Sequence, residues 1–270
     1  MTALRLVLRA PPPTRLDLSP LIPERLSGLS ESAIAGIELG TARASVRVGD
    51  AFALRMGDAE HVAIEGGSER FDYVGADMRA GTLTVEGDAG HCAGRKLRGG
   101  RLTIRGNTGG WAASGLRGGV LAIHGNTGPR LGAPLAGEPT GMAGGLALVR
   151  GRAGERAGDR MRRGLIVIEG DAEEATGSRM LAGTLVVCGK AGPLAGYLMR
   201  RGTLLLAEAD LSSTFILVNG AVTAFQRLLA RRLAEVSQPA ARLAASARHR
   251  FLGDMATLGK GEVLLSTKDG

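Results

Sequence analysis

The sequence has few aromatic residues, two cysteines and no long apolar run. Aromatic residues make up 3% of its 270 residues, so aliphatic side chains must fill most of the interior. No apolar run reaches the length of about 18 residues that a membrane-spanning helix needs, and the first residues contain no convincing signal peptide. Cys92 and Cys188 lie several repeats apart in the pattern described below, so we expect no disulfide and a reducing, cytoplasmic location.

Lysine is also scarce, although the chain is basic. Lysine and arginine number 34 against 26 acidic residues, a formal charge of +8, yet only four of the basic residues are lysine. A bias toward arginine and alanine is typical of GC-rich bacterial genomes, so part of the positive charge reflects composition. Because no basic cluster is interleaved with stacking aromatic residues, we expect no nucleic-acid partner.

What the sequence does contain is glycine in a repeated pattern, G-x-x-G-x-x-x-G. Two copies are incomplete, since Ala113 replaces the third glycine of one copy and Glu173 the second glycine of another. Glycine at a corner permits positive φ and lets one stretch of backbone lie against the next, so we interpret these glycines as structural. They are Gly87, Gly90, Gly94, Gly106, Gly109, Gly125, Gly128, Gly132, Gly151, Gly154, Gly158, Gly170, Gly177, Gly189, Gly192 and Gly196.

The pattern returns at a nearly constant interval. The repeats begin at Met78, Leu97, Leu116, Met142, Met161, Met180 and Met199. The step is 19 residues, except for one step of 26 that indicates a seven-residue insertion within residues 134–141. Repeats this short cannot bury a hydrophobic face alone, so successive copies must stack into a solenoid.

Each repeat contains one stretch in which apolar and variable residues alternate, as in a strand. The inward pairs, such as Leu83 with Val85 and Leu102 with Ile104, are aliphatic. We therefore predict an all-β fold, a single-stranded parallel β-helix of about seven coils with glycine-rich corners. Right-handed coiling is expected, as in other parallel crossover connections.

Both ends of the chain depart from the repeat. Residues 1–57 are predicted to cap the N-terminal end, because a bare terminal coil would be an unpaired edge. Residues 58–220 are assigned to the repeats, and residues 221–270 to a C-terminal helix and tail. Apolar residues at helical spacing predict that helix, and they are Val222, Phe225, Leu228, Leu229, Leu233 and Val236.

No catalytic or metal-binding constellation is evident. The four histidines occupy unrelated positions in the sequence, so we expect neither catalytic residues nor a metal site. The glycine-rich corners lack the G-K-S or G-K-T sequence and the following helix of a phosphate-binding loop. We therefore expect this chain to bind no cofactor of its own.

One outer column of the repeat carries arginine. In five coils the second repeat position is arginine, and like charges stacked about 4.8 Å apart repel one another. These side chains either extend into solvent or form a strip that binds anions, such as the carboxylates of a partner. This arginine strip consists of Arg79, Arg98, Arg117, Arg162 and Arg200, and is interrupted by Ala143 and Leu181.

The outward strand positions are polar in the early coils and apolar in the later ones. Apolar residues on both faces of a strand indicate that both faces are covered. Either the C-terminal helix or a neighbouring protein of a complex is expected to lie over this apolar outer face. Its residues are Leu146, Leu148, Leu165, Val167, Val186 and Leu205.

The glycine motif, which covers most of residues 78–202, resembles that of a known family. Together with Arg-Phe-Leu-Gly-Asp at 250–254 and Gly-Lys-Gly-Glu-Val at 259–263, it resembles the C subunit of formylmethanofuran dehydrogenases. The composition points to the bacterial relative, the C subunit of the formyltransferase/hydrolase complex. The motif is also similar to the C-terminal β-helix domain of glutamate synthase.

The resemblance implies a role in one-carbon metabolism and methylotrophy. In that family, four subunits move a formyl group from tetrahydromethanopterin to a methanofuran-type carrier, which bears a glutamate-rich tail, and release it as formate. Catalysis is attributed to an amidohydrolase-like subunit, which holds metals, and to a formyltransferase subunit. The implied role of this chain is a non-catalytic scaffold that binds these subunits, with no membrane partner.

Two other interpretations stay open. The chain could be a glutamate synthase-like interdomain module, although no glutaminase or synthase domain accompanies it in this sequence. It could also be a β-helix enzyme in its own right. Hexapeptide acyltransferases lack this glycine cluster, however, and polysaccharide lyases need a cleft of carboxylates and arginines that the sequence does not assemble.

Overall fold

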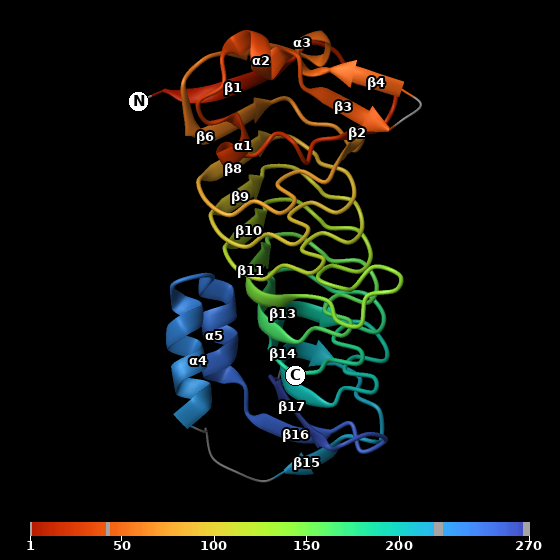
Figure 1. Cartoon of the computed structure of the whole chain (residues 1–270). Helices are drawn as coiled ribbons and strands as arrows, with labels where there is room; N and C mark the ends of the chain where they lie inside the picture. The colour runs from red at the N-terminus through yellow and green to blue at the C-terminus, as the bar shows by residue number, and fades with distance from the viewer. Residues whose placement is uncertain (1, 42–43, 219–223, 267–270) are drawn as a thin grey trace.

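The computed structural model describes residues 2–41, 44–218 and 224–266. The chain is mostly β, and one large, mostly parallel sheet runs along an elongated molecule (Figure 1). From edge to edge, its strands are β15 (Ile216–Val218), β16 (His249–Gly253), β17 (Lys260–Leu265), β14 (Arg201–Ala209), β13 (Thr184–Ala191), β12 (Arg163–Ile168), β11 (Ala143–Val149), β10 (Val120–Ile123), β9 (Arg101–Ile104), β8 (Thr82–Glu86), β6 (Asp58–Glu65), β1 (Ala3–Leu8) and β5 (Phe52–Arg55).

Successive strands of the repeats pair in parallel at a regular offset. Leu83 of β8 lies opposite Leu102 of β9, which lies opposite Leu121 of β10, so that paired residues are 19 positions apart. Between β10 and β11 the offset is 26, since Leu121 lies opposite Ala147. The register therefore has the same step as the glycine pattern, and the insertion at 134–141 lies between β10 and β11.

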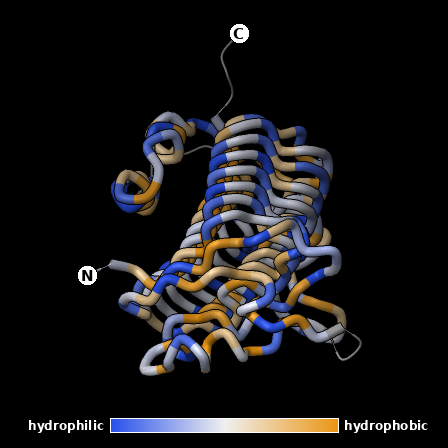
Figure 2. The backbone as a smooth tube through the Cα atoms, turned by 90° about the horizontal axis from the view of Figure 1, so that it is seen from above, coloured by the Kyte–Doolittle hydropathy of each residue, from blue (hydrophilic) through white to orange (hydrophobic). Residues whose placement is uncertain are grey.

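The corners stack as well as the strands. A second parallel ladder of single bridges joins Ala89, Thr108, Thr127, Ala153, Ala172 and Ala191. Beside it, the side-chain oxygen of Asn107 accepts a hydrogen bond from the backbone N–H of Asn126 at 2.8 Å, and Asn126 accepts one from Arg152 in the same way. These bonds join each turn of the chain to the next, and Figure 2 shows the turns lying over one another.

Columns of aliphatic side chains fill the interior. Met78, Leu97 and Leu116, which begin three successive repeats, are fully buried, and so are Leu102 and Leu121 on the strands. Burial of each such side chain contributes roughly 1.5–3 kcal/mol. Stacked aliphatic columns explain why the chain needs few aromatic residues.

Two kinds of glycine fit the corners. A Cβ atom on Gly106 would lie 2.6 Å from the carbonyl carbon of Gly87 in the preceding repeat, which leaves no room for a side chain. Gly94 instead has a φ of +66°, in the left-handed region that glycine adopts at little cost. Ala113 occupies the equivalent position with a φ of 58°, so the incomplete copy keeps this corner at some cost in backbone strain.

The N-terminal segment extends the sheet and covers its end. β1 pairs in parallel with β6, and β5 pairs with β1 in the antiparallel sense. Phe52 and Phe71 pack here with ring centroids 5.8 Å apart. The surrounding elements are α1 (Pro23–Leu26), α2 (Glu31–Ala35) and α3 (Val48–Ala51), the pair β2 (Leu16–Asp17) and β7 (Phe71–Asp72), and the pair β3 (Glu38–Thr41) and β4 (Ala44–Arg47).

The C-terminal segment forms two helices followed by two strands. α4 (Ala224–Ala234) and α5 (Gln238–Ser246) form a hairpin beside the sheet (Figures 1 and 2), and Ser237 caps α5 by accepting a hydrogen bond from the N–H of Ala240. The chain then returns to the sheet, where β17 pairs in parallel with β14. The segment predicted as one helix and a tail therefore contains a second helix and two strands. None of the helices in the described ranges is long and apolar enough to cross a membrane.

The buried face of α4 differs from the predicted one. Leu229 and Leu233 are buried, but Phe225 and Leu228 are 44% and 65% exposed, and Val222 lies outside the described residues. Gln226, which is not one of the predicted apolar residues, is buried. Its side-chain amide donates to the backbone carbonyls of residues 244 and 247 at the end of α5. A polar contact between the two helices, which helical spacing does not reveal, thus sets the rotation of α4.

Candidate partner-binding face

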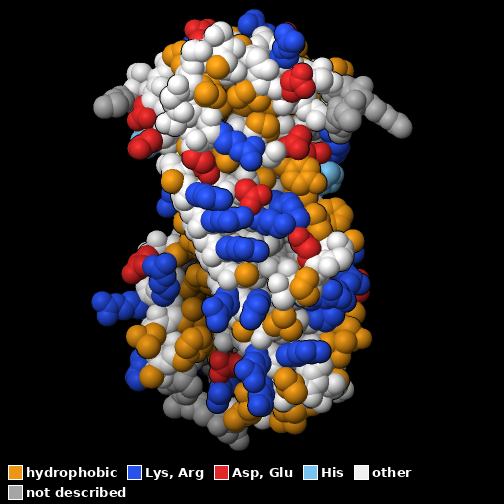
Figure 3. Space-filling view, in the orientation of Figure 1, with side chains coloured by type: hydrophobic (Ala, Val, Ile, Leu, Met, Phe, Trp, Pro, Cys, Tyr) orange, Lys and Arg blue, Asp and Glu red, His pale blue; other side chains and the backbone are white. Residues whose placement is uncertain are grey.

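The arginine strip lies in one exposed column of the structure. Each strip residue after the first donates its backbone N–H to the carbonyl of the Met or Leu that begins the preceding repeat. Arg98 donates in this way to Met78 and Arg117 to Leu97, both at 2.8 Å. All five strip side chains are exposed. Figure 3 shows basic side chains stacked along the middle of the molecule. The strip is therefore an exposed basic column, interrupted at Ala143 and Leu181, that solvent or a partner can reach.

Most of the strip has no acidic partner among the residues that the structure describes. Arg98 forms an ion pair with Asp77 at 3.1 Å. Among the described residues, no carboxylate lies within 4.0 Å of the guanidinium groups of Arg79, Arg117, Arg162 and Arg200. Neighbouring like charges at strand spacing repel by about 1 kcal/mol even in water. Anions, and above all planar carboxylates that match the guanidinium fork, therefore bind such a column favourably.

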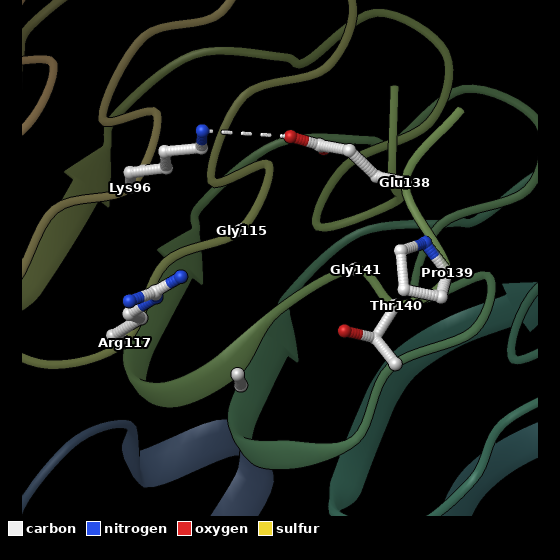
Figure 4. Close-up of a pocket in the computed structure, with 8 residues that line it drawn as sticks. Lys96, Gly115, Arg117, Glu138, Pro139, Thr140 and Gly141 are labelled. Atoms are coloured by element: carbon white, nitrogen blue, oxygen red, sulfur yellow. Dashed lines mark ion pairs between the residues drawn. The ribbon is translucent and has the colours of Figure 1, made fainter. Parts of the chain in front are cut away.

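The insertion at 134–141 already places one carboxylate on this face. Glu138 accepts a hydrogen bond from Arg95 at 2.7 Å and lies 3.6 Å from the amine of Lys96, an ion pair drawn in Figure 4. Its second oxygen accepts from the backbone N–H of Leu135 at 3.1 Å. The hydrogen bond from Arg95 is the main cause that lowers the pKa of Glu138 below its ordinary value of 4.5. Basic side chains beside the strip thus hold an acidic loop residue.

Two depressions flank the insertion, and each includes one residue of the strip. The first, of about 230 Å³, is lined by Arg117, with Pro139 and Thr140 on the insertion side (Figure 4). The second, of about 440 Å³, is lined by Arg160 and Arg200 and shares the same proline and threonine. Sequence reasoning missed both depressions, because their walls depend on the path of the insertion. Their signal in the sequence is the single 26-residue step.

The apolar outer face lies under the helical hairpin. Val167, Val186 and Leu205 are fully buried, and Leu148 is 8% exposed. The helix residues packed against them are Leu229, Leu233, Ala240, Leu243, Ala244 and Ala247. Leu146 and Leu165 are partly buried at the margin of this cluster. The chain therefore covers most of this face with its own helices, and only the margin at Leu146 and Leu165 stays partly open.

The histidines and cysteines do not converge on one site. The ring of His61 forms a hydrogen bond with the hydroxyl of Thr82 at 2.8 Å, whereas the ring of His91 accepts one from the backbone N–H of Gly110 in the next repeat. In the part of the chain that the structure describes, no three His, Cys, Asp or Glu side chains are grouped to hold a metal ion. Cys92 and Cys188 are free thiols, and burial raises the pKa of Cys188 to about 12. Such a thiol is protonated and a poor nucleophile.

An exposed basic column on a stacked repeat is typical of a protein that binds other chains over an extended surface. No family model matches the sequence. A chain in the crystal structure of the formyltransferase/hydrolase complex (FhcABCD) from Methylorubrum extorquens, in complex with methylofuran, superimposes on this one with a TM-score of 0.92. The two chains are 40% identical, and the match covers 97% of this chain and 98% of that one.

A curated relative identifies the family more narrowly. The C subunit of the formyltransferase/hydrolase complex Fhc of Methylorubrum extorquens AM1 is 42% identical to this chain over 90 residues, a segment that spans 33% of either protein. The chain belongs to the family of this C subunit.

Proposed function

We propose that this chain is the scaffold subunit of a formyltransferase/hydrolase complex. The observation that carries the proposal is the 40% identity to a chain of the FhcABCD complex over 97% of this sequence. A match of that length includes surface residues as well as the core. In the reaction that the resemblance implies, a formyl group passes from tetrahydromethanopterin to a methanofuran-type carrier and leaves as formate.

The architecture proposed for this role is a right-handed, single-stranded parallel β-helix. Residues 1–57 form its cap, residues 58–220 its coils, and residues 221–270 the C-terminal helical segment with its tail. The parallel register and the second ladder of corner bridges support this path of the chain. A rod of this kind presents a long, rigid surface to other proteins.

The chemistry is assigned to the other subunits. An amidohydrolase-like subunit with its metals and a formyltransferase subunit carry out the two reactions, and they bind the carrier and tetrahydromethanopterin. The protonated, partly buried thiol of Cys188 and the separate environments of the histidines support a non-catalytic role for this chain.

The arginine strip is proposed to bind carboxylates of a neighbouring subunit. The binding of Glu138 by Arg95 and Lys96 is an example of this recognition within the chain. The acidic tail of the carrier is the alternative ligand. We favour a partner surface, because a rigid acidic surface loses less conformational entropy on docking than a flexible chain does.

Copurification from the native host tests the proposal. The full-length chain would carry a small affinity tag, be isolated from the cytoplasmic fraction, and have its associated proteins identified by mass spectrometry. We expect the amidohydrolase-like subunit, the formyltransferase subunit and the remaining member of the complex in constant proportion across independent preparations. Recovery of the chain alone, or with glutamate synthase components, would contradict the proposal.

An activity assay separates a scaffold from an enzyme. The purified chain alone should show neither formyltransferase nor hydrolase turnover, whereas the complete complex should show both. Turnover by the chain alone that is lost on substitution of one of its own residues would contradict the scaffold role.

A further inference from the structure

A third depression lies beside the first half of the insertion. It has a volume of about 400 Å³, within the range of small-molecule sites, and residues 134–137 form one wall. Trp111, the single tryptophan of the chain, forms another part of the wall with Arg130 and Arg156. We call this depression the tryptophan pocket. It contains no residue of the arginine strip.

The repeat places three of its residues one above another. Trp111 donates its backbone N–H to the carbonyl of Pro129 at 2.9 Å, and Arg130 donates to that of Glu155 at 2.7 Å. Trp111, Arg130 and Arg156 therefore occupy the same corner position in successive coils, with φ values of 58°, 65° and 57°. The indole and the two arginine side chains thus start from equivalent backbone positions in the wall of the pocket.

The indole positions one of these guanidinium groups. The guanidinium carbon of Arg130 lies 5.7 Å from the centre of the Trp111 ring, within the range of a cation–π contact. The ring of His91 packs edge-on against the indole at 6.2 Å. A guanidinium that lies against an aromatic ring keeps its in-plane N–H groups available to donate to an oxyanion.

The pocket carries an excess of positive charge. Its one acidic side chain, Asp159, accepts two hydrogen bonds from Arg179 at 2.8 and 2.6 Å, so these two charges offset each other. Among the described residues, no carboxylate lies within 4.0 Å of the guanidinium groups of Arg130, Arg156 and Arg160. Three positive charges around one concave space favour a ligand with two negative charges over one with a single charge.

We propose that the tryptophan pocket binds a dianionic small molecule through a phosphate-ester or dicarboxylate group. The guanidinium forks of Arg130 and Arg156 match the geometry of either group. The concave wall formed by the insertion favours a small molecule over the flat surface of another protein. The site does not depend on the role of the chain in the complex.

Fluorescence titration tests this site directly, because Trp111 is the single tryptophan. The full-length chain would be titrated with inorganic phosphate and with succinate at low ionic strength, and calorimetry would measure the same equilibria. We expect saturable binding of at least one probe with a change in Trp111 emission. Arg156→Gln and Arg130→Gln should each weaken that binding about tenfold or more.

The matched control is Arg152→Gln, which removes an exposed arginine from the same coil outside the pocket. Its affinity for both probes should equal that of the unmodified chain. Thermal unfolding of every variant separates a lost ligand contact from a lost fold. No saturable binding of either probe, or equal effects of Arg152→Gln and Arg156→Gln, would overturn the proposal. Binding of a triaspartate peptide but of neither small probe would also overturn it, and would assign the pocket to an acidic segment of a partner.

Discussion

The outer face of the sheet has two halves, an open half that faces solvent and a covered half that lies under α4 and α5. One continuous column of outward residues runs from Thr84 and Thr103 to Val167, Val186 and Leu205. The threonines are partly exposed, whereas the last three residues are fully buried against the cluster formed with α4 and α5. The repeat therefore determines which inward positions are apolar. Whether an outward position is apolar depends instead on the element that lies over it.

Replacing Val186 with Asp is the most severe test of the covered half. The new carboxylate would lie between the sheet and the helices without a partner, so we expect a loss of at least about 3 kcal/mol in the free energy of unfolding. Thr103→Asp, in the same column of the open half, should cost less than about 1 kcal/mol, because its carboxylate can reach water. Chemical denaturation measures both. Equal losses would contradict the distinction between the halves.

A second test acts on the covering helix itself. Leu233 is fully buried, whereas Leu228 on the same helix is 65% exposed. Leu233→Ala should lower the free energy of unfolding by about 2–4 kcal/mol through the cavity it leaves. Leu228→Ala should change it by no more than about 0.5 kcal/mol. Urea denaturation of the full-length chain provides both values, and a large loss at Leu228 would show that α4 is rotated in solution.

The sequence predicted some of the features that these tests address, but not all of them. The inward columns and the change from Thr103 to Val186 could be predicted, because stacking makes residues 19 positions apart into neighbours. The identity of the element that covers the apolar outer face could not be predicted, since either the C-terminal helix or a partner protein could bury the same apolar residues. The answer depends on where α4 and α5 lie relative to the sheet, and the repeat does not encode their position.

The repeat pattern did not predict two other features, strand β17 and the depressions beside the insertion. β17 continues the parallel sheet with Val263 and Leu265 fully or largely buried, but it lacks the glycine cluster that marked the other coils. The arginine strip followed from spacing alone, whereas the depressions beside it depend on the path of the insertion. The 26-residue step marks where that path departs from the repeat but does not specify it, and the role of Glu138 in holding the insertion was missed.

A third prediction concerns how stability depends on pH at the insertion, where Glu138 binds Arg95 and Lys96. The pKa of Glu138 is lowered in the folded chain, so its contribution to stability is complete above the ordinary pKa of 4.5 and is lost as the pH falls through the lower folded value. Glu138→Gln should therefore be less stable than the unmodified chain by about 1 kcal/mol at neutral pH, and the difference should disappear in acid. Thermal unfolding across this pH range measures it.

The control for this pH effect is Glu174→Gln, which changes an exposed carboxylate without an ion-pair partner among the described residues. It should leave the pH dependence unchanged. If Glu138→Gln and the unmodified chain lose stability in parallel as the pH falls, the insertion is not held by its carboxylate.

The smallest effects per residue are expected at the arginine strip. Arg117→Glu combined with Arg162→Glu should leave the stability of the chain unchanged, because both side chains are exposed and neither has an acidic partner among the described residues. Arg98 is less suitable, since it is paired with Asp77. Each exposed contact with a partner carboxylate contributes under about 1 kcal/mol and weakens with salt. The double variant should therefore lose its partner subunits at a lower salt concentration than the unmodified chain.

Size-exclusion chromatography of the complex at increasing salt measures this loss. The matched control is Arg227→Glu combined with Arg231→Glu, which places the same charge change on the exposed side of α4. Since α4 belongs to the half that the chain covers by itself, the control should dissociate at the same salt concentration as the unmodified complex. If both double variants behave alike, net charge rather than the position of the strip governs assembly.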